Sequence, residues 1–270
     1  MLPLISNEQI RIFDSLGLHK GQMDDNVALV TGSARGIGKY TARALAALGA
    51  RVVIADISPE GEQVAQQIKD DGGQAQFVQT DVGDARAVEH LLATAQAQFG
   101  PVDILVNNAA RARLGKVLEQ PVSSWHADFT TNLLGPLMLI QGVVPGVIER
   151  QLGVVLSLIS LEGMPFMGLY CANKMALRSM MLTLGKEIPP STGVSVLSVM
   201  PGAVNTPLLQ DMIQSFADFW ASTSRTCGPR CRTTRATTAW CPWNTPLRRW
   251  PGSVPTHASS TASSWTATCR

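Results

Sequence analysis

The stretch VALVTGSARGIG, residues 27–38, decides the fold of this chain. Its first five residues are mostly apolar and β-branched, which is typical of a buried strand. Gly32, Gly36 and Gly38 follow, and a helical pattern of apolar residues begins at about residue 36. A strand, a glycine-rich turn and a helix in this order predict a phosphate-binding unit, because the free N–H groups of a helix N-terminus face the anion.

The alternation of strand and helix continues along most of the chain. Each strand, crossover helix and following strand make a unit in which the two strands run parallel. The sequence therefore predicts an α/β protein with a doubly wound parallel sheet, the Rossmann fold. The predicted strands are 27–31, 51–56, 74–82, 102–108, 153–160 and 194–202, and the predicted helices are roughly 36–48, 59–71, 84–98, 122–150, 170–188 and 208–220.

The composition changes near Trp220. All 20 Asp and Glu residues precede it, whereas the segment after it holds seven arginines, four of the six tryptophans and no acid. We therefore predict three regions: an N-terminal extension over 1–25, a Rossmann-fold dinucleotide-binding and catalytic domain over 26–220, and an aberrant low-complexity tail over 221–270.

The rest of the composition is that of a soluble globular protein, with 45% hydrophobic and 16% charged residues. No uninterrupted apolar run approaches the roughly 18–20 residues that a membrane helix needs. The N-terminal segment carries Glu8 and Asp14 where a secretory signal would be apolar. Cys171 is the only cysteine before the tail, so no disulfide framework is expected there. We expect a cytoplasmic protein with no membrane partner.

Two side chains near the glycine turn bear on the choice of cofactor. Asp56 ends the second predicted strand, where a carboxylate can accept hydrogen bonds from the ribose hydroxyls of NAD and would repel the 2′-phosphate of NADP. Arg35, inside the turn, instead favours NADP, since a guanidinium can pair with a 2′-phosphate. The carboxylate is the stronger discriminator, because an arginine can swing into solvent. We expect NAD.

The glycine turn resembles the TGxxxGxG motif of the short-chain dehydrogenase/reductase family. The resemblance covers residues 27–207, and it implies a Rossmann fold, nicotinamide-dependent oxidoreduction of alcohols and ketones, and a homodimer or homotetramer. It continues at DV (81–82), NNAA (107–110), Asn132 in NLLG, YCANK (170–174) and PGAVNTP (201–207).

The resemblance also implies which residues bind the cofactor. Asp81 and Val82 would border the adenine, Asn107 would support the cofactor strand, and Thr206 would reach the carboxamide of the nicotinamide. The complete set of cofactor-binding residues expected in this way is Gly32, Ser33, Arg35, Gly36, Ile37, Gly38, Asp56, Asp81, Val82, Asn108, Ala109, Tyr170, Lys174, Pro201, Gly202 and Thr206.

The catalytic chemistry can be argued from residue types. Removing hydride from a secondary alcohol needs a base for the hydroxyl proton, and a tyrosine serves only if its pKa is lowered from about 10. Lys174 lies one helical turn after Tyr170, so its ammonium can stabilise the phenolate. A serine would hold the substrate oxygen, and Asn132 would anchor a water on a proton route to solvent.

Two serines compete for that role. Ser160 follows an apolar strand in the context that the family uses, but it lies only ten residues before Tyr170, whereas the usual spacing is about thirteen. Ser157 has the usual spacing. The two residues are three apart, so in a strand they would face opposite sides of the sheet. We favour Ser160, with a shortened substrate loop, and keep Ser157 as the alternative.

The tail lacks the ending that family members have, so the last strand of the sheet is expected to be missing. Back-translation in the shifted reading frame forces Glu at Trp243–Asn244 and Asp at Trp265–Thr266, and it permits a family-like ending. We interpret the tail as frameshifted. Two weaker readings remain, a zinc site and a nucleic-acid surface formed by the seven arginines; the zinc ligands would be Cys227, Cys231, Cys241 and His257.

We therefore expect an NAD-dependent oxidoreductase that acts on a small alcohol or ketone, with no metal and no nucleic-acid partner. Its catalytic set would be Ser160, Tyr170, Lys174 and Asn132. The alternatives are an NADPH-dependent carbonyl reductase, favoured by Arg35, and an inactive or incompletely folded product of the altered C-terminus. The sequence leaves the substrate open, because the segments that select it are variable loops.

Overall fold

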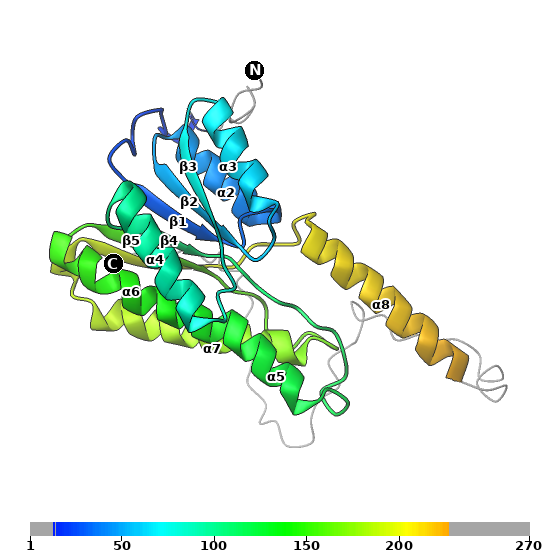
Figure 1. Ribbon diagram of the computed structural model, residues 1–270. Helices are drawn as coiled ribbons and strands as arrows, with labels where there is room; N and C mark the ends of the chain where they lie inside the picture. Colours follow the sequence, from blue (N-terminus) through cyan, green and yellow to red (C-terminus); the bar gives the residue numbers. More distant parts are fainter. Residues whose placement is uncertain (1–12, 14, 227–270) are drawn as a thin grey trace, which may run out of the picture. The chain divides into compact units, whose positions relative to one another are not determined.

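The computed structural model describes residues 13 and 15–226. Most of the N-terminal segment and the tail 227–270 lie outside the described residues. The frameshift, zinc and nucleic-acid interpretations all concern that tail. Within that part, six strands form one parallel sheet in the order β3-β2-β1-β4-β5-β6 (Figure 1). This confirms the predicted doubly wound fold. The strands are β1 (Val27–Thr31), β2 (Arg51–Asp56), β3 (Gln74–Gln79), β4 (Ile104–Asn107), β5 (Gly153–Leu158) and β6 (Val194–Val199).

Helices cover both faces of the sheet and make two hydrophobic cores. One core joins the sheet to α2 and α3, and the other joins it to α4, α6 and α7. Residues that alternate along each strand divide between the cores, as Ala28 and Leu29 do in β1, because successive side chains point to opposite faces. The helices are α2 (Gly36–Ala47), α3 (Gly61–Asp70), α4 (Ala85–Phe99), α6 (Gly135–Arg150) and α7 (Gly168–Glu187).

The prediction of a single helix over 122–150 is wrong in one detail. In the structure this stretch consists of α5 (Val122–Phe129), the π-helical turn η1 (Thr130–Leu134) and α6. By length and composition the whole stretch could cross a membrane. Its apolar side chains, among them Leu139 and Val143, belong instead to the core against the sheet. The π-helical turn inserts an extra residue into the helical repeat, as such turns commonly do at functional sites.

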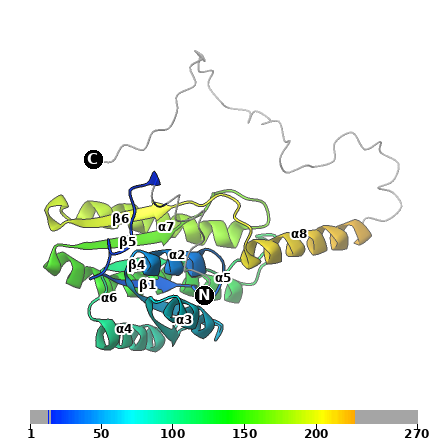
Figure 2. The ribbon, with the colours of Figure 1, turned by 90° about the horizontal axis from the view of Figure 1, so that it is seen from above.

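Strand β6 is the last strand of the described sheet. It pairs with β5, and no described strand pairs with its other edge. The segment in which the last strand is expected to be missing lies outside the described residues. Figure 2 shows β6 at the outer edge of the sheet. Leu197 and Val199 in β6 are 44% and 42% exposed, and Met200 is 52% exposed. Apolar side chains on an edge strand at these exposures are a surface prone to association.

Helix α8 (Pro207–Thr226) follows β6 and agrees with the helix predicted over 208–220, although it continues past the predicted domain boundary at 220. Thr206 caps it, with its hydroxyl accepting a hydrogen bond from the Leu209 backbone N–H at 3.3 Å. Phe216 in α8 contacts Phe166 edge to face, with ring centroids 6.1 Å apart. The first turns of α8 are thereby joined to the loop between β5 and α7.

Candidate active site

The glycine turn has the backbone that its sequence predicts. Gly32 and Gly36 have φ angles of 63° and 56°, in the left-handed region that side chains disfavour. A Cβ on Gly32 would lie 2.7 Å from the Cα of Ala109, and a Cβ on Gly36 would lie 3.3 Å from the Thr206 side chain. Helix α2 begins at Gly36, so its N-terminal N–H groups and positive dipole end face the space beside the glycine turn.

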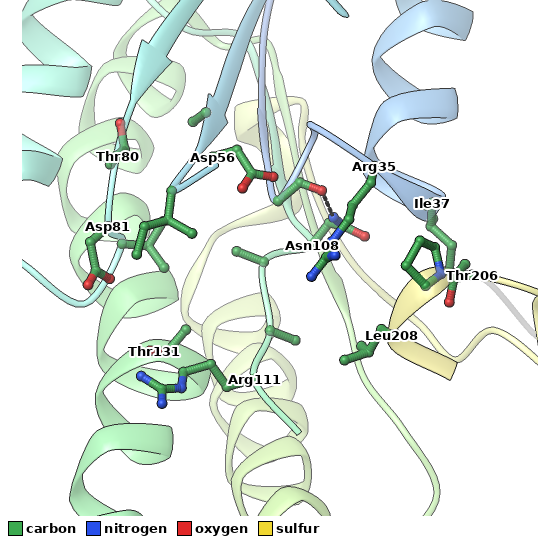
Figure 3. Close-up of a pocket in the computed structure, with 18 residues that line it drawn as sticks. Arg35, Ile37, Asp56, Thr80, Asp81, Asn108, Arg111, Thr131, Thr206 and Leu208 are labelled. Carbon is green, nitrogen blue, oxygen red and sulfur yellow. Dashed lines mark hydrogen bonds between the residues drawn. The ribbon is translucent and has the colours of Figure 1, made fainter. Parts of the chain in front are cut away.

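A cavity of about 330 Å³ opens beside this turn (Figure 3). It lies beyond the carboxyl ends of β1 and β4, where the strand order reverses and where doubly wound sheets bind dinucleotides. Ten predicted cofactor residues line it: Gly32, Arg35, Gly36, Ile37, Asp56, Asp81, Val82, Asn108, Ala109 and Thr206. Three features of this site therefore fit a dinucleotide. The glycine turn has no room for side chains, the N-terminus of α2 can face phosphates, and the carboxylate of Asp56 can face a ribose.

Asp56 holds the turn as well as facing the cavity. One carboxylate oxygen accepts a hydrogen bond from the Ala34 backbone N–H, and the other accepts one from the Ser58 backbone N–H, both at 2.9 Å. Each oxygen can accept further hydrogen bonds, because a carboxylate has about four acceptor positions. The Arg35 side chain is exposed, and its guanidinium makes no hydrogen bond with the described residues, whereas its backbone carbonyl accepts one from the Lys39 N–H at 3.3 Å.

Thr31 and Asn108 tie the ends of β1 and β4 together. The Thr31 hydroxyl accepts hydrogen bonds from the backbone N–H groups of Asn108 and Ala109, both at 3.1 Å. The Asn108 side-chain amide in turn donates to the carbonyls of Thr31 and Gly32, both at 2.8 Å. Asn107 is buried, and its side chain donates to the Ser157 hydroxyl at 3.3 Å, which links β4 to β5. The floor of the cavity is fixed by these contacts.

Six predicted cofactor residues do not line this cavity. Ser33 is fully buried beneath the turn, where its hydroxyl donates to the Val30 carbonyl at 2.7 Å. Gly38 is buried in α2, where the close approach of Gly32 and Asn108 leaves no space for a Cβ. The other four, Tyr170, Lys174, Pro201 and Gly202, lie outside the lining of the cavity.

The predicted catalytic residues form a separate group at the end of β5 and the start of α7. The Ser160 hydroxyl lies close enough to the Tyr170 side chain to act on its pKa, which it lowers. The Lys174 ammonium lies 5.9 Å from the centre of the Tyr170 ring and donates to the Leu158 carbonyl at 2.7 Å. An ammonium has three N–H donors, so two remain for other partners. The structure thus brings Ser160, Tyr170 and Lys174 together.

Ser157 is placed elsewhere. It is fully buried in β5, where its hydroxyl lies 3.2 Å from the Met181 sulfur and accepts the hydrogen bond from Asn107. Ser160 lies two residues beyond the strand, near Tyr170. The geometry therefore favours Ser160 over Ser157 as the serine that can meet a substrate.

Burial shifts the pKa of both titratable groups. It raises the pKa of Tyr170 above 10, although the nearby Ser160 hydroxyl pulls that pKa down. The structure therefore does not show the expected lowering of the Tyr170 pKa by Lys174. The loss of solvation around the phenol outweighs the interactions that lower this pKa. Burial also lowers the pKa of Lys174 to about 8. Lys174 is only 2% exposed, so its ammonium loses most of its hydration by water.

Asn132 is fully buried in the π-helical turn η1. Its side-chain oxygen accepts a hydrogen bond from the Arg111 backbone N–H, and its amide donates to the Arg111 carbonyl, both at 2.9 Å. Because η1 also packs against α7, Asn132 connects the cavity wall to the helix that carries Tyr170 and Lys174.

Several cavity residues were missed at the sequence level. Arg111 and Thr131 are the most informative, because each directly adjoins a recognised motif: Arg111 follows NNAA, and Thr131 precedes Asn132. The carboxyl ends of parallel strands meet at one edge, so residues that follow such a strand could have been included on topology alone. The remaining missed lining residues are Ala55, Ile57, Thr80, Ala110, Pro207 and Leu208.

Comparison with known proteins gives one consistent result. Residues 26–215 match the family described as short chain dehydrogenase. The chain is 36% identical over 191 residues to a 3-oxoacyl-[acyl-carrier-protein] reductase of Synechocystis sp., covering 69% of this chain and 77% of that one. It is 34% identical over 192 residues to a 3-alpha-(or 20-beta)-hydroxysteroid dehydrogenase of Mycobacterium tuberculosis, covering 70% and 72%. It spans 63% of a short chain dehydrogenase of Pseudocercospora fijiensis, at 33% identity.

Solved structures give the same picture. An actinorhodin polyketide ketoreductase with NADPH superposes with a TM-score of 0.69 at 32% identity, over 72% of this chain and 77% of that one. A metagenomic short-chain oxidoreductase in complex with NADP superposes with a TM-score of 0.65 at 30% identity, over 73% and 92%.

Proposed function

Because the chain belongs to the short-chain dehydrogenase family, a family of nicotinamide-dependent oxidoreductases, we propose that it interconverts a secondary alcohol and a ketone. The observation that carries this proposal is the grouping of Ser160 and Tyr170 with the buried Lys174, whose ammonium lies 5.9 Å from the centre of the Tyr170 ring. These three side chains bring together a proton donor or acceptor, a hydrogen-bond donor for an oxygen atom and a cation. This is the set that an alcohol needs when it loses a proton and a hydride.

Each residue has a distinct part in this reaction. The nicotinamide supplies the hydride acceptor or donor. Ser160 would hold the substrate oxygen, and Tyr170 would take the hydroxyl proton in oxidation or return it in reduction. Lys174 has two free N–H donors with which it would hold the cofactor ribose and, as an ammonium, stabilise the Tyr170 phenolate.

For the cofactor we propose NAD. Asp56 supports it, because its fixed carboxylate faces the cavity where the adenosine ribose would lie and would repel a 2′-phosphate. The alternative is an NADPH-dependent carbonyl reductase, which two observations favour. Arg35 lines the same cavity and is exposed, and two of the similar solved structures are described with NADP or NADPH.

Substitution of Asp56 tests the choice of cofactor. In Asp56→Ala we expect the Kd for NAD to rise about tenfold, because one charge-assisted acceptor for the ribose hydroxyls is lost. The Kd for NADP should fall, since the repulsion is removed. Quenching of protein fluorescence on titration with each cofactor measures both constants. Tighter binding of NADP than of NAD by the unaltered chain would contradict the proposal and support the carbonyl reductase.

Substitution of the two serines tests the catalytic group. We expect Ser160→Ala to lower kcat about tenfold to a hundredfold, because the substrate oxygen loses its hydrogen bond in the transition state. Ser157→Ala is the matched control and should leave kcat nearly unchanged. The measurement is the absorbance of reduced cofactor with a panel of secondary alcohols and ketones. The reverse pattern would assign the role to Ser157, and cofactor binding without any turnover would identify an inactive product.

A further inference from the structure

A second cavity, of about 420 Å³, adjoins the cofactor cavity. Arg111 lines both, so the two are neighbours. The second cavity is bounded by the loop that follows β4, by α5 and by α8. Its lining consists of Arg111, Ala112, Arg113, Leu114, Asp128 and Ser215. It thus contains two guanidinium groups and one carboxyl group.

Asp128 is the unusual member of this lining. Its side chain is 1% exposed, and neither carboxyl oxygen accepts a hydrogen bond from any residue in the described part of the chain. The nearest cation is Arg111, with its Nε 3.5 Å from one oxygen. Burial raises the pKa of Asp128, while the charges of Arg111 and Arg113 act against that rise. A buried carboxyl group with open acceptor positions is costly, so its presence needs an explanation other than folding.

Arg111 is oriented by this carboxyl group and remains accessible. Its side chain is 50% exposed, and its terminal nitrogens form no hydrogen bond with described residues. The backbone of Arg111 is fixed on both sides by Asn132. Figure 3 shows the guanidinium beside Thr131 and away from Arg35. A guanidinium held through its Nε keeps two parallel N–H groups available, which is the geometry that binds a carboxylate.

The second cavity also adjoins the loop that leads to Tyr170. Ser215 in its lining precedes Phe216, and the Phe216 ring packs on Phe166, four residues before Tyr170. The carbonyl of Phe166 accepts a hydrogen bond from the Gly115 backbone N–H at 2.8 Å. Phe166 has a φ angle of 63°, which is strained for an aromatic residue. The walls of this cavity are therefore segments next to the catalytic group.

We propose that the cavity between Arg111, Arg113 and Asp128 is a substrate subsite that takes the carboxylate of an acidic ketone or hydroxy acid. The proposal rests on the proposed function for the identity of the reacting group. Arg111 binds the carboxylate. Arg113 donates a hydrogen bond from Nη1 to the Ser124 hydroxyl at 2.6 Å and adds a second positive charge. Asp128 is a positioning residue, which holds the guanidinium of Arg111 toward the cavity.

Binding measurements test this subsite without relying on turnover. The probes are straight-chain keto acids of increasing length, beginning with levulinate, and their methyl esters. Each is titrated calorimetrically into the full chain saturated with oxidised cofactor, in which a ketone cannot react. We expect at least one acid to bind about tenfold more tightly than its ester. Arg111→Gln should abolish that difference, and Arg111→Lys should restore part of it.

The controls separate the subsite from the cofactor site and from folding. Asp128→Asn keeps the shape of the side chain, so it should lower the preference for the acid severalfold while leaving ester binding unchanged. Arg178→Gln, at an exposed position of α7, should change nothing. Equal affinity of acids and esters for the unaltered chain would overturn the proposal. It would also be overturned if Arg111→Gln weakened cofactor binding and left the acids unaffected, since Arg111 would then serve the cofactor. If the unaltered chain bound the acids more tightly than their esters but turned over no alcohol or ketone, the proposed function would be rejected and the subsite would stand.

Discussion

Tyr170→Phe is expected to lower kcat by about a hundredfold to ten thousandfold, the range that a positioned acid or base contributes. The phenylalanine ring fills the same space, so folding and cofactor affinity should be retained. Only the phenol hydroxyl near Ser160 is lost. The measurement is hydride transfer, followed by the absorbance of reduced cofactor, together with a fluorescence titration of cofactor binding.

The chain offers a matched control, because it has only two tyrosines. Tyr40 lies on α2 and is 61% exposed, so Tyr40→Phe should leave kcat within experimental error. If Tyr170→Phe retained most of its activity while Ser160→Ala lost it, the proton would have to be transferred by another group. The assignment of Tyr170 would then be wrong.

Lys174→Met is expected to lower kcat and to raise the free energy of unfolding. The methionine removes the ammonium from beside Tyr170, and we expect kcat to fall about a hundredfold or more, as when one charged stabilising group is removed from an active site. At pH 7 the same change should raise the free energy of unfolding by about 2 kcal/mol. The shift of the Lys174 pKa from 10.5 to about 8 corresponds to a cost of about 3 kcal/mol. Loss of the hydrogen bond to the Leu158 carbonyl offsets about 1 kcal/mol of this gain.

The stability gain depends on pH with a definite sign. The folded-state pKa of Lys174 lies below its unfolded value, so between about pH 8 and 10.5 the unfolded chain binds more protons. The stability of the unaltered chain should therefore rise with pH across this window relative to Lys174→Met, and the advantage of the variant should disappear. Urea unfolding at several pH values measures the difference. Lys186→Met, at an exposed position of the same helix, is the control, and an equal gain there would contradict the explanation.

Much of the fold could be predicted from the sequence because its signals are local. The buried runs of β1 and β2 are short, β-branched and bounded by turns, so both strands begin and end where the pattern indicates. The glycine turn is equally local, because Gly32 and Gly36 sit at positions that only glycine occupies comfortably. The boundaries of β3, β4, β5 and β6 were less accurate, because these strands were predicted one to three residues beyond their observed ends.

What the sequence could not supply depends on contacts between distant segments. The π-helical turn around Asn132 leaves no trace in the apolar periodicity. The burial of Asp128 depends on the loop after β4 and on α8, which no local pattern reports. The sign of the pKa shift of Tyr170 was also missed. The sequence places Lys174 one turn away, but the amount of solvent removed from the phenol is set by the complete fold.

Strand β6, whose outer edge no described strand covers, is hydrogen-bonded to the segment that anchors Lys174. Leu158, whose carbonyl anchors the Lys174 ammonium, is paired with Val199 of β6, and the Ile159 N–H donates to the Val199 carbonyl at 2.9 Å. A strand fastened on one side only frays more readily than one held on both sides. Each fraying event would loosen the anchor of Lys174, so under the proposed function we expect the fraction of molecules competent for hydride transfer to depend on how often β6 is paired. Anything that clamps β6 would raise that fraction without touching the reacting atoms.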